Sequence, residues 1–346
     1  MRSSRPVRAL VAAALLTTVA ACGGSSDEAA PAGDAEDALV LYSGRNEALI
    51  GPLLARFTEA SGIAVTPRYG DSAALAATLL EEGDRTPAAA FLSQDAGALG
   101  ALQDADRLTE LPDDQLDRVP EAYRSPEGRW VGLSGRSRVL LYDSAVVDEG
   151  DLPDSVFDLT DPTYRGTVGI APTNASFQSF VTGMRVLEGE DRTREFLEGL
   201  QANDVQTYEN NIAILDAVES GQIPFGLANH YYLYERVAAT EGGLEALDAR
   251  NHFFDGGDPG ALVNVAGIGV LEGKDDDRTE QLVEFLLSDE SQRYFADDTK
   301  EFPLVDGVEA VEDLPTIEDL EGPDVDLSEL DSLQETQALL EEVGLT

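Results

Sequence analysis

The chain has 346 residues, of which 67 are acidic and 23 are lysine or arginine, so its formal net charge at pH 7 is −44. A surface of this charge repels nucleic acids and anionic lipid headgroups, which excludes both as partners. We interpret the charge as a device for solubility, with adaptation to a salty habitat as an open alternative. Cys22 is the only cysteine, so no disulfide can form within one chain and the fold must be stabilised by its core.

The N-terminus predicts export and a lipid anchor. Three arginines within the first eight residues precede an apolar stretch that is too short to span a bilayer and ends in small residues. Val-Ala-Ala-Cys at 19–22 resembles a bacterial lipobox, in which the cysteine is lipidated and becomes the first mature residue. We predict a signal peptide over 1–21, lipidation of Cys22 and an acidic flexible tether over 22–38. An ordinary signal peptide cleaved nearby is the alternative.

Apolar periodicity after residue 38 predicts alternating strands and helices. Apolar residues in 47–61 recur at helical spacing, Gly62 is a typical helix end, and a second helix is expected to begin at a Ser72 cap. The expected order is strand 38–44, helix 47–61, strand 63–69, helix 72–82 and strand 88–93. Such a run forms a mainly parallel sheet, and ligands gather at the carboxyl ends of its strands. The turns at 43–46 and 93–95 should therefore face a site.

The same pattern continues to the C-terminus and predicts two α/β lobes. The expected strands are 131–143, 167–173, 204–209, 224–230 and an apolar run at 261–271, and the expected helices are 210–223, 278–296 and one from about Ser328. We predict that the chain crosses between the lobes more than once. The N-terminal lobe is expected to comprise 39–135 plus 262–312, and the C-terminal lobe 136–261 plus 313–346.

Several motifs now stand in a recognisable order. They are LYSGRNE (41–47), EEGDRTPAAAFLSQD (81–95), WVGLSGRSRVLLYD (130–143), GIAPTNASF (169–177), YENNIAILDAVESGQIPFGLANHYYLYER (208–236) and DPGALVNVAGIGVL (258–271). The chain resembles the periplasmic ferric-iron-binding proteins, which are the substrate-binding components of ABC iron importers. The resemblance implies a two-lobed periplasmic-binding-protein fold with an inter-lobe cleft, similar to one lobe of transferrin. It also implies an extracytoplasmic, monomeric, non-enzymatic protein that delivers iron to a membrane permease.

The resemblance assigns a role to the adjacent tyrosines of the NHYY motif. In this family the pair supplies phenolate ligands to Fe³⁺, which implies that Tyr231 and Tyr232 are metal ligands. Fe³⁺ is a hard cation that prefers anionic oxygen donors, and a trivalent ion can displace a phenolic proton whose ordinary pKa is about 10. Packing is the alternative, since neighbouring tyrosines on a helix usually point in different directions.

Other ligand positions of the family differ here. Asn46 stands where the family often has a histidine, Gln94 where it has a glutamate, and Phe177 where some relatives have a further tyrosine. We expect structural roles for His230 and His252. The chain thus offers two phenolates and few other anionic ligands. Iron could still bind with an anion and waters, or it could arrive as a chelate, such as ferric citrate, whose carboxylates would replace the missing ligands.

The family also holds a synergistic anion, phosphate or carbonate, on the same iron. The positions that bind it in phosphate-binding relatives correspond here to Asn174, Ala175, Ser176, Asn211 and Asn229. A helix beginning after Asn174 would add its positive N-terminal end. Ser134, Arg136 and Arg138 lie near the inter-lobe hinge of the family, and Arg136 could balance the anion or form a hinge salt bridge. Asn46, Gln94, Asp95 and Arg136 are further candidates for lining the site.

Three other functions remain open at this point. The same fold could bind an organic anion, a polyamine or a thiamine-like molecule, although an organic cation would favour aromatic faces and Trp130 is the only indole. An enzyme is disfavoured because the chain has no phosphate loop, HExxH motif or cysteine-based site. A purely structural surface lipoprotein would leave the turn motifs at the strand ends without a purpose.

Overall fold

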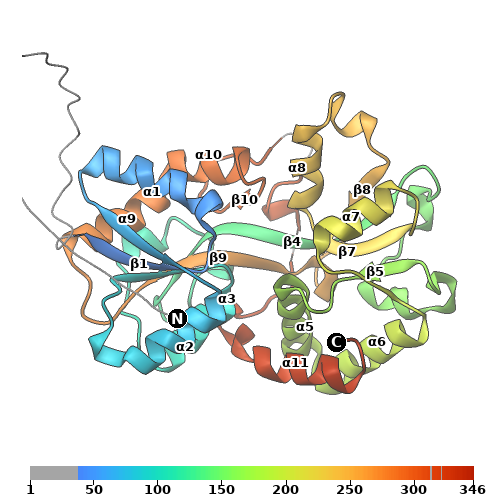
Figure 1. The fold of residues 1–346 in the computed structure, drawn as a ribbon, viewed down its shortest axis with the longest axis horizontal. Coiled ribbons are helices and arrows are strands. Elements are labelled where there is room, and N and C mark those ends of the chain that lie inside the picture. Colours follow the sequence, from blue (N-terminus) through green and yellow to red (C-terminus); the bar gives the residue numbers. More distant parts are fainter. Residues whose placement is uncertain (1–37, 312–313, 321) are drawn as a thin grey trace, which may run out of the picture.

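The computed structural model describes residues 38–311, 314–320 and 322–346. The predicted signal peptide, the predicted lipidation site at Cys22 and the tether up to residue 37 lie outside the described residues. Figure 1 shows two lobes side by side, joined by strands that run from one into the other. Across the described ranges, no helix is both long and apolar enough to cross a membrane.

The strands fall into two groups joined by the long strand β4 (Val131–Asp143). On one side are β1 (Leu39–Ser43), β2 (Val65–Tyr69), β3 (Ala90–Ser93), β9 (Val263–Val270) and β10 (Phe302–Pro303). On the other are β5 (Val168–Ile170), β6 (Gln206–Thr207), β7 (Phe225–Asn229) and β8 (Ala249–His252). The strand order is β2-β1-β3-β9-β4-β7-β5-β6, with β8 and β10 each paired to β4.

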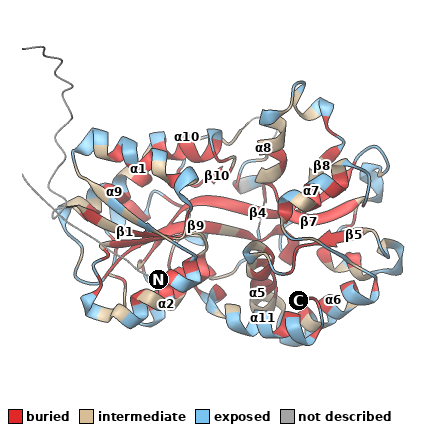
Figure 2. Cartoon of the chain, in the orientation of Figure 1, coloured by how far each residue is buried: buried red, intermediate tan, exposed pale blue. Residues whose placement is uncertain are grey.

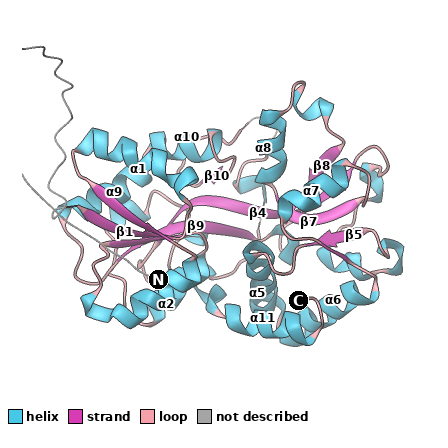
Figure 3. Ribbon diagram, viewed as in Figure 1, coloured by secondary structure: helices cyan, strands magenta, loops and turns pink. Residues whose placement is uncertain are grey.

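The sheet is mixed, and β4 is its crossing point (Figure 3). Its first part pairs with β9 as far as Ser137, and its second part pairs with β7 from Arg138 onward. Strand β1 is parallel to β2 and β3, and β5 is parallel to β6 and β7, as the βαβ pattern predicts. The pairs that involve β4, and the pair of β3 with β9, are antiparallel. Arg138 therefore lies where the sheet passes between the lobes.

In each lobe, helices cover both faces of the sheet (Figure 1). The first lobe has α1 (Glu47–Ser61), α2 (Ser72–Glu82), α3 (Ala96–Asp104), α4 (Asp113–Leu116), α9 (Asp277–Leu286) and α10 (Asp289–Asp297). The second has α5 (Ala175–Glu188), α6 (Glu190–Ala202), α7 (Asn211–Glu219), α8 (Tyr231–Ala239) and α11 (Leu333–Glu342). A 3₁₀ segment, Leu327–Asp331, precedes α11.

One expected helix is divided in two, and another has the expected bounds but a different cap residue. The helix expected over 278–296 is divided into α9 and α10, because the Ser288 hydroxyl accepts a hydrogen bond from the Ser291 amide at 3.3 Å and begins a new helix. The cap of α2 is Asp71, whose carboxylate accepts from the Ala74 amide at 3.1 Å. The Ser72 hydroxyl instead accepts from the Gln94 amide at 2.9 Å and ties α2 to the turn after β3.

Buried residues gather on the strands of both lobes (Figure 2). The core consists of separate apolar clusters, and successive parts of β4 belong to different ones. Leu133 and Leu262 belong to the first cluster, whereas Leu140 and Ala261 belong to the second. The C-terminal segment enters the second lobe later in the chain than the expected boundary at residue 313. Ile317, Leu320, Leu327 and Leu330 pack in the first cluster, and Leu339, Leu340, Val343 and Leu345 pack in the second. The chain thus passes to the second lobe between Leu330 and Leu339.

Candidate metal centre

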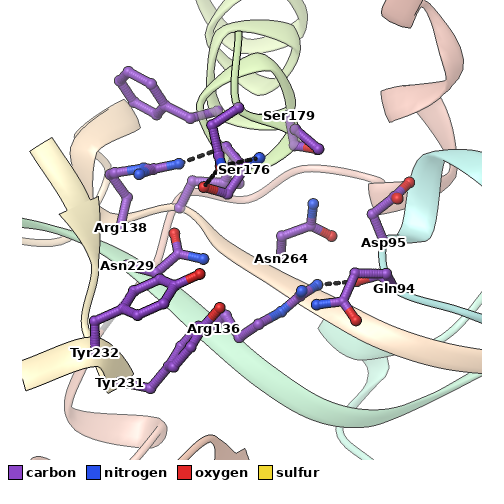
Figure 4. A pocket seen from close by; sticks show the side chains of 14 residues that line it. Gln94, Asp95, Arg136, Arg138, Ser176, Ser179, Asn229, Tyr231, Tyr232 and Asn264 are labelled. Atoms are coloured by element: carbon purple, nitrogen blue, oxygen red, sulfur yellow. Dashed lines mark hydrogen bonds between the residues drawn. The ribbon is translucent and has the colours of Figure 1, made fainter. Parts of the chain in front are cut away.

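A cavity of about 200 Å³ lies between the lobes, beside the ends of β3 and β7 and the N-termini of α5 and α8. Its lining residues are Gln94, Asp95, Arg136, Arg138, Asn174, Ala175, Ser176, Ser179, Phe180, Asn229, Tyr231, Tyr232, Leu262 and Asn264. In Figure 4 the two tyrosines lie on one side, Gln94 and Asp95 lie on the other, and Arg136 extends between them. Most of the predicted site residues therefore share one cavity.

The two tyrosines converge. Strand β7 ends at Asn229 and α8 begins at Tyr231, so both phenols project from the first turn of a helix at the cavity wall. Adjacent residues further along a helix diverge by about 100°, but these rings stack with their centroids 4.3 Å apart and an interplanar angle of 30°. Burial raises the pKa of the Tyr231 phenol well above its ordinary value of 10, and the neighbouring Tyr232 adds to the rise. The Tyr231 phenol is therefore protonated at neutral pH.

Two buried arginines project from one face of β4, as alternate residues of a strand do. Arg136 is 6% exposed and Arg138 is 3% exposed. Arg136 donates a hydrogen bond to the Gln94 carbonyl, and Arg138 donates to the Ser176 carbonyl and, at 3.5 Å, to Asn211 Oδ1. Within the described ranges, the Nε atom of each arginine has no hydrogen-bond partner. Both cations keep donor capacity in a cavity wall, which suits the binding of an anion.

Arg138 is the less compensated of the two. Among the described residues it forms no ion pair, and its guanidinium lies 5.5 Å from the centre of the Phe180 ring. Burial lowers its pKa to about 10, although the nearby phenols oppose the shift. It remains charged at neutral pH, so a positive charge is held in a poorly solvated position. Such a charge is costly unless a ligand brings a compensating one.

Glu301 organises the cations behind the cavity. Its carboxylate accepts two hydrogen bonds from the Arg45 guanidinium, at 2.9 and 3.0 Å, and one from the Ser134 hydroxyl at 2.7 Å. Arg136 Nε lies 4.0 Å from Glu301 Oε1. Although burial alone would raise the pKa of Glu301, Arg45 and Arg136 hold it below its ordinary value. Both terminal nitrogens of Arg45 are thus bonded to Glu301, whereas Arg136 is only loosely paired with it and lines the cavity.

The predicted anion-binding residues surround the N-terminus of α5. Asn174 caps this helix, because its side chain accepts from the Ser176 amide at 3.0 Å. Asn174, Ala175, Ser176 and Asn229 line the cavity, but Asn211 does not. The buried Asn211 side chain donates to Asn174 and Ser176 and accepts from the Asn229 amide at 3.3 Å. Asn211 therefore holds three lining residues in place and is not itself directed at a ligand.

The first lobe contributes Gln94 and Asp95 from the turn after β3. Asp95 caps α3, since its carboxylate accepts from the Ala98 amide at 3.1 Å, and burial raises its pKa. Asn46 is not part of the cavity. It is exposed, and its side chain caps α1 by accepting from the Leu49 amide at 3.0 Å. Asn46 thus has a structural role at a helix start.

Both histidines have backbone partners. His230 is fully buried, with Nδ1 accepting from the Ser137 amide at 3.2 Å and Nε2 lying 3.0 Å from the Lys300 carbonyl. Burial lowers its pKa to about 4. His252 Nε2 lies 3.0 Å from the Pro153 carbonyl. No cluster of three or more His, Cys, Asp or Glu side chains suited to a metal ion occurs within the described parts of the chain.

The sequence prediction missed several lining residues. The sequence analysis places Arg138 near the hinge only, yet this residue lines the cavity. It follows Arg136 by two positions on a strand, and this spacing puts both side chains on one face. Ser179 and Phe180 lie one turn into α5, and Leu262 and Asn264 lie at the start of β9. No pattern in the sequence marks these four residues as site residues.

Comparison with known proteins identifies the family of this chain. The family model for bacterial extracellular solute-binding proteins matches residues 87–326. The Fe(3+)-binding periplasmic protein of Serratia marcescens is 30% identical over 318 residues, which cover 91% of this chain and 93% of that protein. The major ferric iron-binding protein of Neisseria meningitidis serogroup B is 34% identical over 313 residues, covering 89% of this chain and 93% of that protein.

Solved structures show the same likeness. Iron-bound HitA from Pseudomonas aeruginosa has a TM-score of 0.79 at 33% identity and covers 89% of this chain and 99% of its own. The Trichodesmium protein IdiA (FutA), in complex with iron and citrate, has a TM-score of 0.76 at 26% identity and covers 89% of this chain and 100% of its own. The predicted two-lobed α/β fold is confirmed. This chain is a member of the periplasmic ferric iron-binding protein family, within the bacterial extracellular solute-binding proteins.

Proposed function

We propose that this protein is the substrate-binding lipoprotein of an ABC-type ferric iron importer and that Tyr231 and Tyr232 coordinate the Fe³⁺ ion. The observation that carries the proposal is the pair of stacked phenols in a cavity that also holds two buried arginines. The named functions of the relatives from Serratia and Neisseria support it. Binding and delivery, rather than catalysis, is the activity that this arrangement serves.

The chemistry of the phenols fits a hard trivalent cation. Fe³⁺ prefers anionic oxygen donors, and its charge displaces the phenolic protons when the oxygens coordinate. Because burial keeps the Tyr231 phenol protonated in the absence of metal, each binding event must release protons. Cations of lower charge displace such protons less readily, so a raised phenol pKa favours Fe³⁺ over divalent ions.

The charges of the site call for an anion together with the metal. Fe³⁺ with two phenolates keeps one positive charge, and Arg136 and Arg138 add two more, which the Asp95 carboxylate offsets only in part. Phosphate, carbonate or a polycarboxylate would bring the site near neutrality. The amide and hydroxyl groups of Asn174, Ser176 and Asn229, with the N-terminus of α5, form a cradle for such an anion.

The set of protein ligands is too small to surround the ion. Within the described residues no further cluster of acidic, histidine or cysteine ligands supports the phenols, and the first lobe offers the neutral Gln94 and a single carboxylate, Asp95. The remaining coordination positions therefore belong to the anion, to water or to a chelator. The Trichodesmium relative in complex with iron and citrate is a precedent for the last choice.

Capture and delivery follow from the two-lobed arrangement. Iron first meets the tyrosines of the second lobe, and the first lobe then closes over it through the Gln94–Asp95 turn. Asn46, an exposed helix cap, takes no part in this closure. We propose that the monomeric protein is tethered outside the cytoplasm by a lipid on Cys22 and that a membrane permease opens the closed form.

The first experiment is a titration of the purified protein with ferric citrate, monitored by visible absorption. Phenolate-to-Fe³⁺ charge transfer produces a red-orange band that carboxylates and amides do not give. We expect the band in the wild type and its loss in the Tyr231→Phe/Tyr232→Phe double variant. A colourless wild type that still binds a ligand by calorimetry would overturn the proposal.

A further inference from the structure

A second cavity adjoins the candidate metal centre. It has a volume of about 210 Å³ and lies between α2 and α3 of the first lobe and α5 of the second. The two cavities share Asp95, Ala175 and Ser179 in their walls. The two cavities are therefore direct neighbours, and we call the second one the side cavity.

One wall of the side cavity is a segment that is hydrogen-bonded to both lobes. This wall includes Leu330 and Asp331 of the 3₁₀ segment that precedes α11. This segment is anchored to the first lobe, where the Trp130 indole donates to the Ser328 hydroxyl at 3.2 Å. It is anchored to the second lobe by Arg185, which donates to the Ser332 carbonyl at 3.0 Å. The side cavity is thus bounded by elements of both lobes and is not a gap between loose loops.

The lining of the side cavity is mostly apolar, and its charged residues are all acidic. Alanines at 73, 76, 77, 98, 101 and 175 supply much of its surface. Asp71, Asp95 and Asp331 also line it, and no basic side chain from the described residues does. The metal centre has the opposite character, because its lining includes Arg136 and Arg138. A carboxylate is therefore attracted to the metal centre and repelled from the side cavity, whereas an uncharged apolar group is accepted there.

We propose that the side cavity binds an uncharged apolar arm of an iron chelator whose anionic end coordinates Fe³⁺ beside Tyr231 and Tyr232. This inference rests on the proposed function, since it assigns the class of chelate that the same site takes. A multidentate chelator must supply the ligands that the protein lacks, and the rest of the molecule must leave the small metal centre. The cavities adjoin at Asp95, Ala175 and Ser179, so the proposed arm would pass beside these residues, and the apolar surface beyond them would bind it.

The test uses ferric complexes of three citrate derivatives, in each of which one terminal carboxylate is replaced by an N-substituted amide. The N-methyl amide has a short arm, the N-butyl amide has a long apolar arm, and the N-(3-carboxypropyl) amide has a long arm with a terminal carboxylate. All three present the same iron-binding end. We expect the butyl complex to bind the wild-type protein about tenfold more tightly than the methyl complex, because additional CH₂ groups are buried. The carboxylate-terminated arm should lose this advantage.

A matched pair of variants locates the effect. Ala77 and Ala74 are both exposed on α2, but only Ala77 lines the side cavity. Leucine is a good helix former, so both substitutions should leave α2 folded. Ala77→Leu should fill the side cavity and remove the preference for the butyl complex, whereas Ala74→Leu should retain it. Ferric citrate, which lacks the arm, is expected to give the same charge-transfer band with all three proteins.

The outcomes separate this inference from the proposed function. Equal binding of the butyl and methyl complexes, with a normal charge-transfer band for both, overturns the side-cavity inference and leaves the iron site intact. A butyl preference that survives Ala77→Leu overturns the location of the arm. Absence of the band with every complex overturns the proposed function itself, and the inference with it.

Discussion

At the scale of single residues, the protonated phenol of Tyr231 makes iron binding depend on pH. Burial raises the pKa of this phenol further above neutrality, and coordination as a phenolate expels its proton, so affinity rises as the pH rises through the neutral range. We expect the logarithm of the affinity to increase by about one unit per pH unit for each phenol that coordinates, and Tyr231→Phe to lower this slope by about one unit. Calorimetry at several pH values, in buffers that differ in ionisation enthalpy, measures the protons released.

Tyr208 provides the control for this effect. Burial raises its phenol pKa too, but Tyr208 does not line the cavity. Tyr208→Phe should therefore leave the slope unchanged. An unchanged slope in Tyr231→Phe would show that this phenol is not a ligand, whatever the loss of affinity.

Glu301 is expected to stabilise the fold more than any exposed acid. Glu301→Gln would leave Arg45 buried without a counter-charge, so the free energy of unfolding should fall by about 3–5 kcal/mol. The pKa of Glu301 lies below its ordinary value of 4.5. Its contribution is therefore complete above that value and is lost as the pH falls through the lowered, folded-state pKa. Urea unfolding of both proteins from pH 7 to pH 3 measures the difference.

Glu290 is the matched comparison for Glu301. It is exposed and lies 3.8 Å from Arg56, in a surface ion pair. Glu290→Gln should change the free energy of unfolding by no more than about 1 kcal/mol. Equal effects of the two substitutions at pH 7 would contradict the central role assigned to Glu301.

At the scale of secondary-structure elements, the contact between α3 and the 3₁₀ segment requires glycine. A Cβ atom added at Gly97 would lie 2.0 Å from the Leu330 carbonyl oxygen, so the backbone would have to move. We expect Gly97→Ala to lower the free energy of unfolding by about 1–3 kcal/mol. A Cβ at Gly51 in α1 would meet nothing closer than 3.5 Å, and Gly51→Ala should stabilise the protein by about 0.5–1 kcal/mol. Chemical unfolding checks both, and destabilisation by both would contradict the argument.

Elements with strong local signals could be predicted from the sequence. The bounds of α1 agree with the prediction because Asn46 caps its start and Gly62, with φ 75°, ends it in the left-handed region that glycine favours. The break between α9 and α10 was not predicted, since the apolar spacing continues across Ser288 and a single hydroxyl decides the boundary. Periodicity thus indicates which residues face the core, whereas a cap decides where the helix stops.

The site was only partly predictable because its parts come from distant positions. The tyrosines and the residues at the N-terminus of α5 lie in short motifs, so the family resemblance was enough to predict that they belong to the site. The Arg45–Glu301 pair joins residues 256 positions apart, and no local pattern connects them. The same limit applies to the side cavity, whose walls come from both lobes and from the C-terminal segment.

At the scale of the whole molecule, the net charge of −44 acts on the species that the protein captures. Such a field attracts free cations and repels anionic chelates, and added salt screens both interactions. If iron arrives as an anionic citrate complex, the association rate constant should increase several-fold between about 10 mM and 150 mM salt. If it arrives as a free cation, the rate constant should decrease. Stopped-flow observation of the charge-transfer band measures the sign directly.

An uncharged iron complex separates screening from other effects of salt. A ferric complex of zero net charge at the working pH, with three monoanionic ligands around Fe³⁺, feels little force from the long-range field of the protein. Its association rate constant should change little over the same range of salt. Sodium and potassium chloride should act alike, because screening depends on ionic strength alone. A rate constant for ferric citrate that falls with salt would contradict capture of the anionic chelate and would favour free Fe³⁺ as the species that first meets the tyrosines.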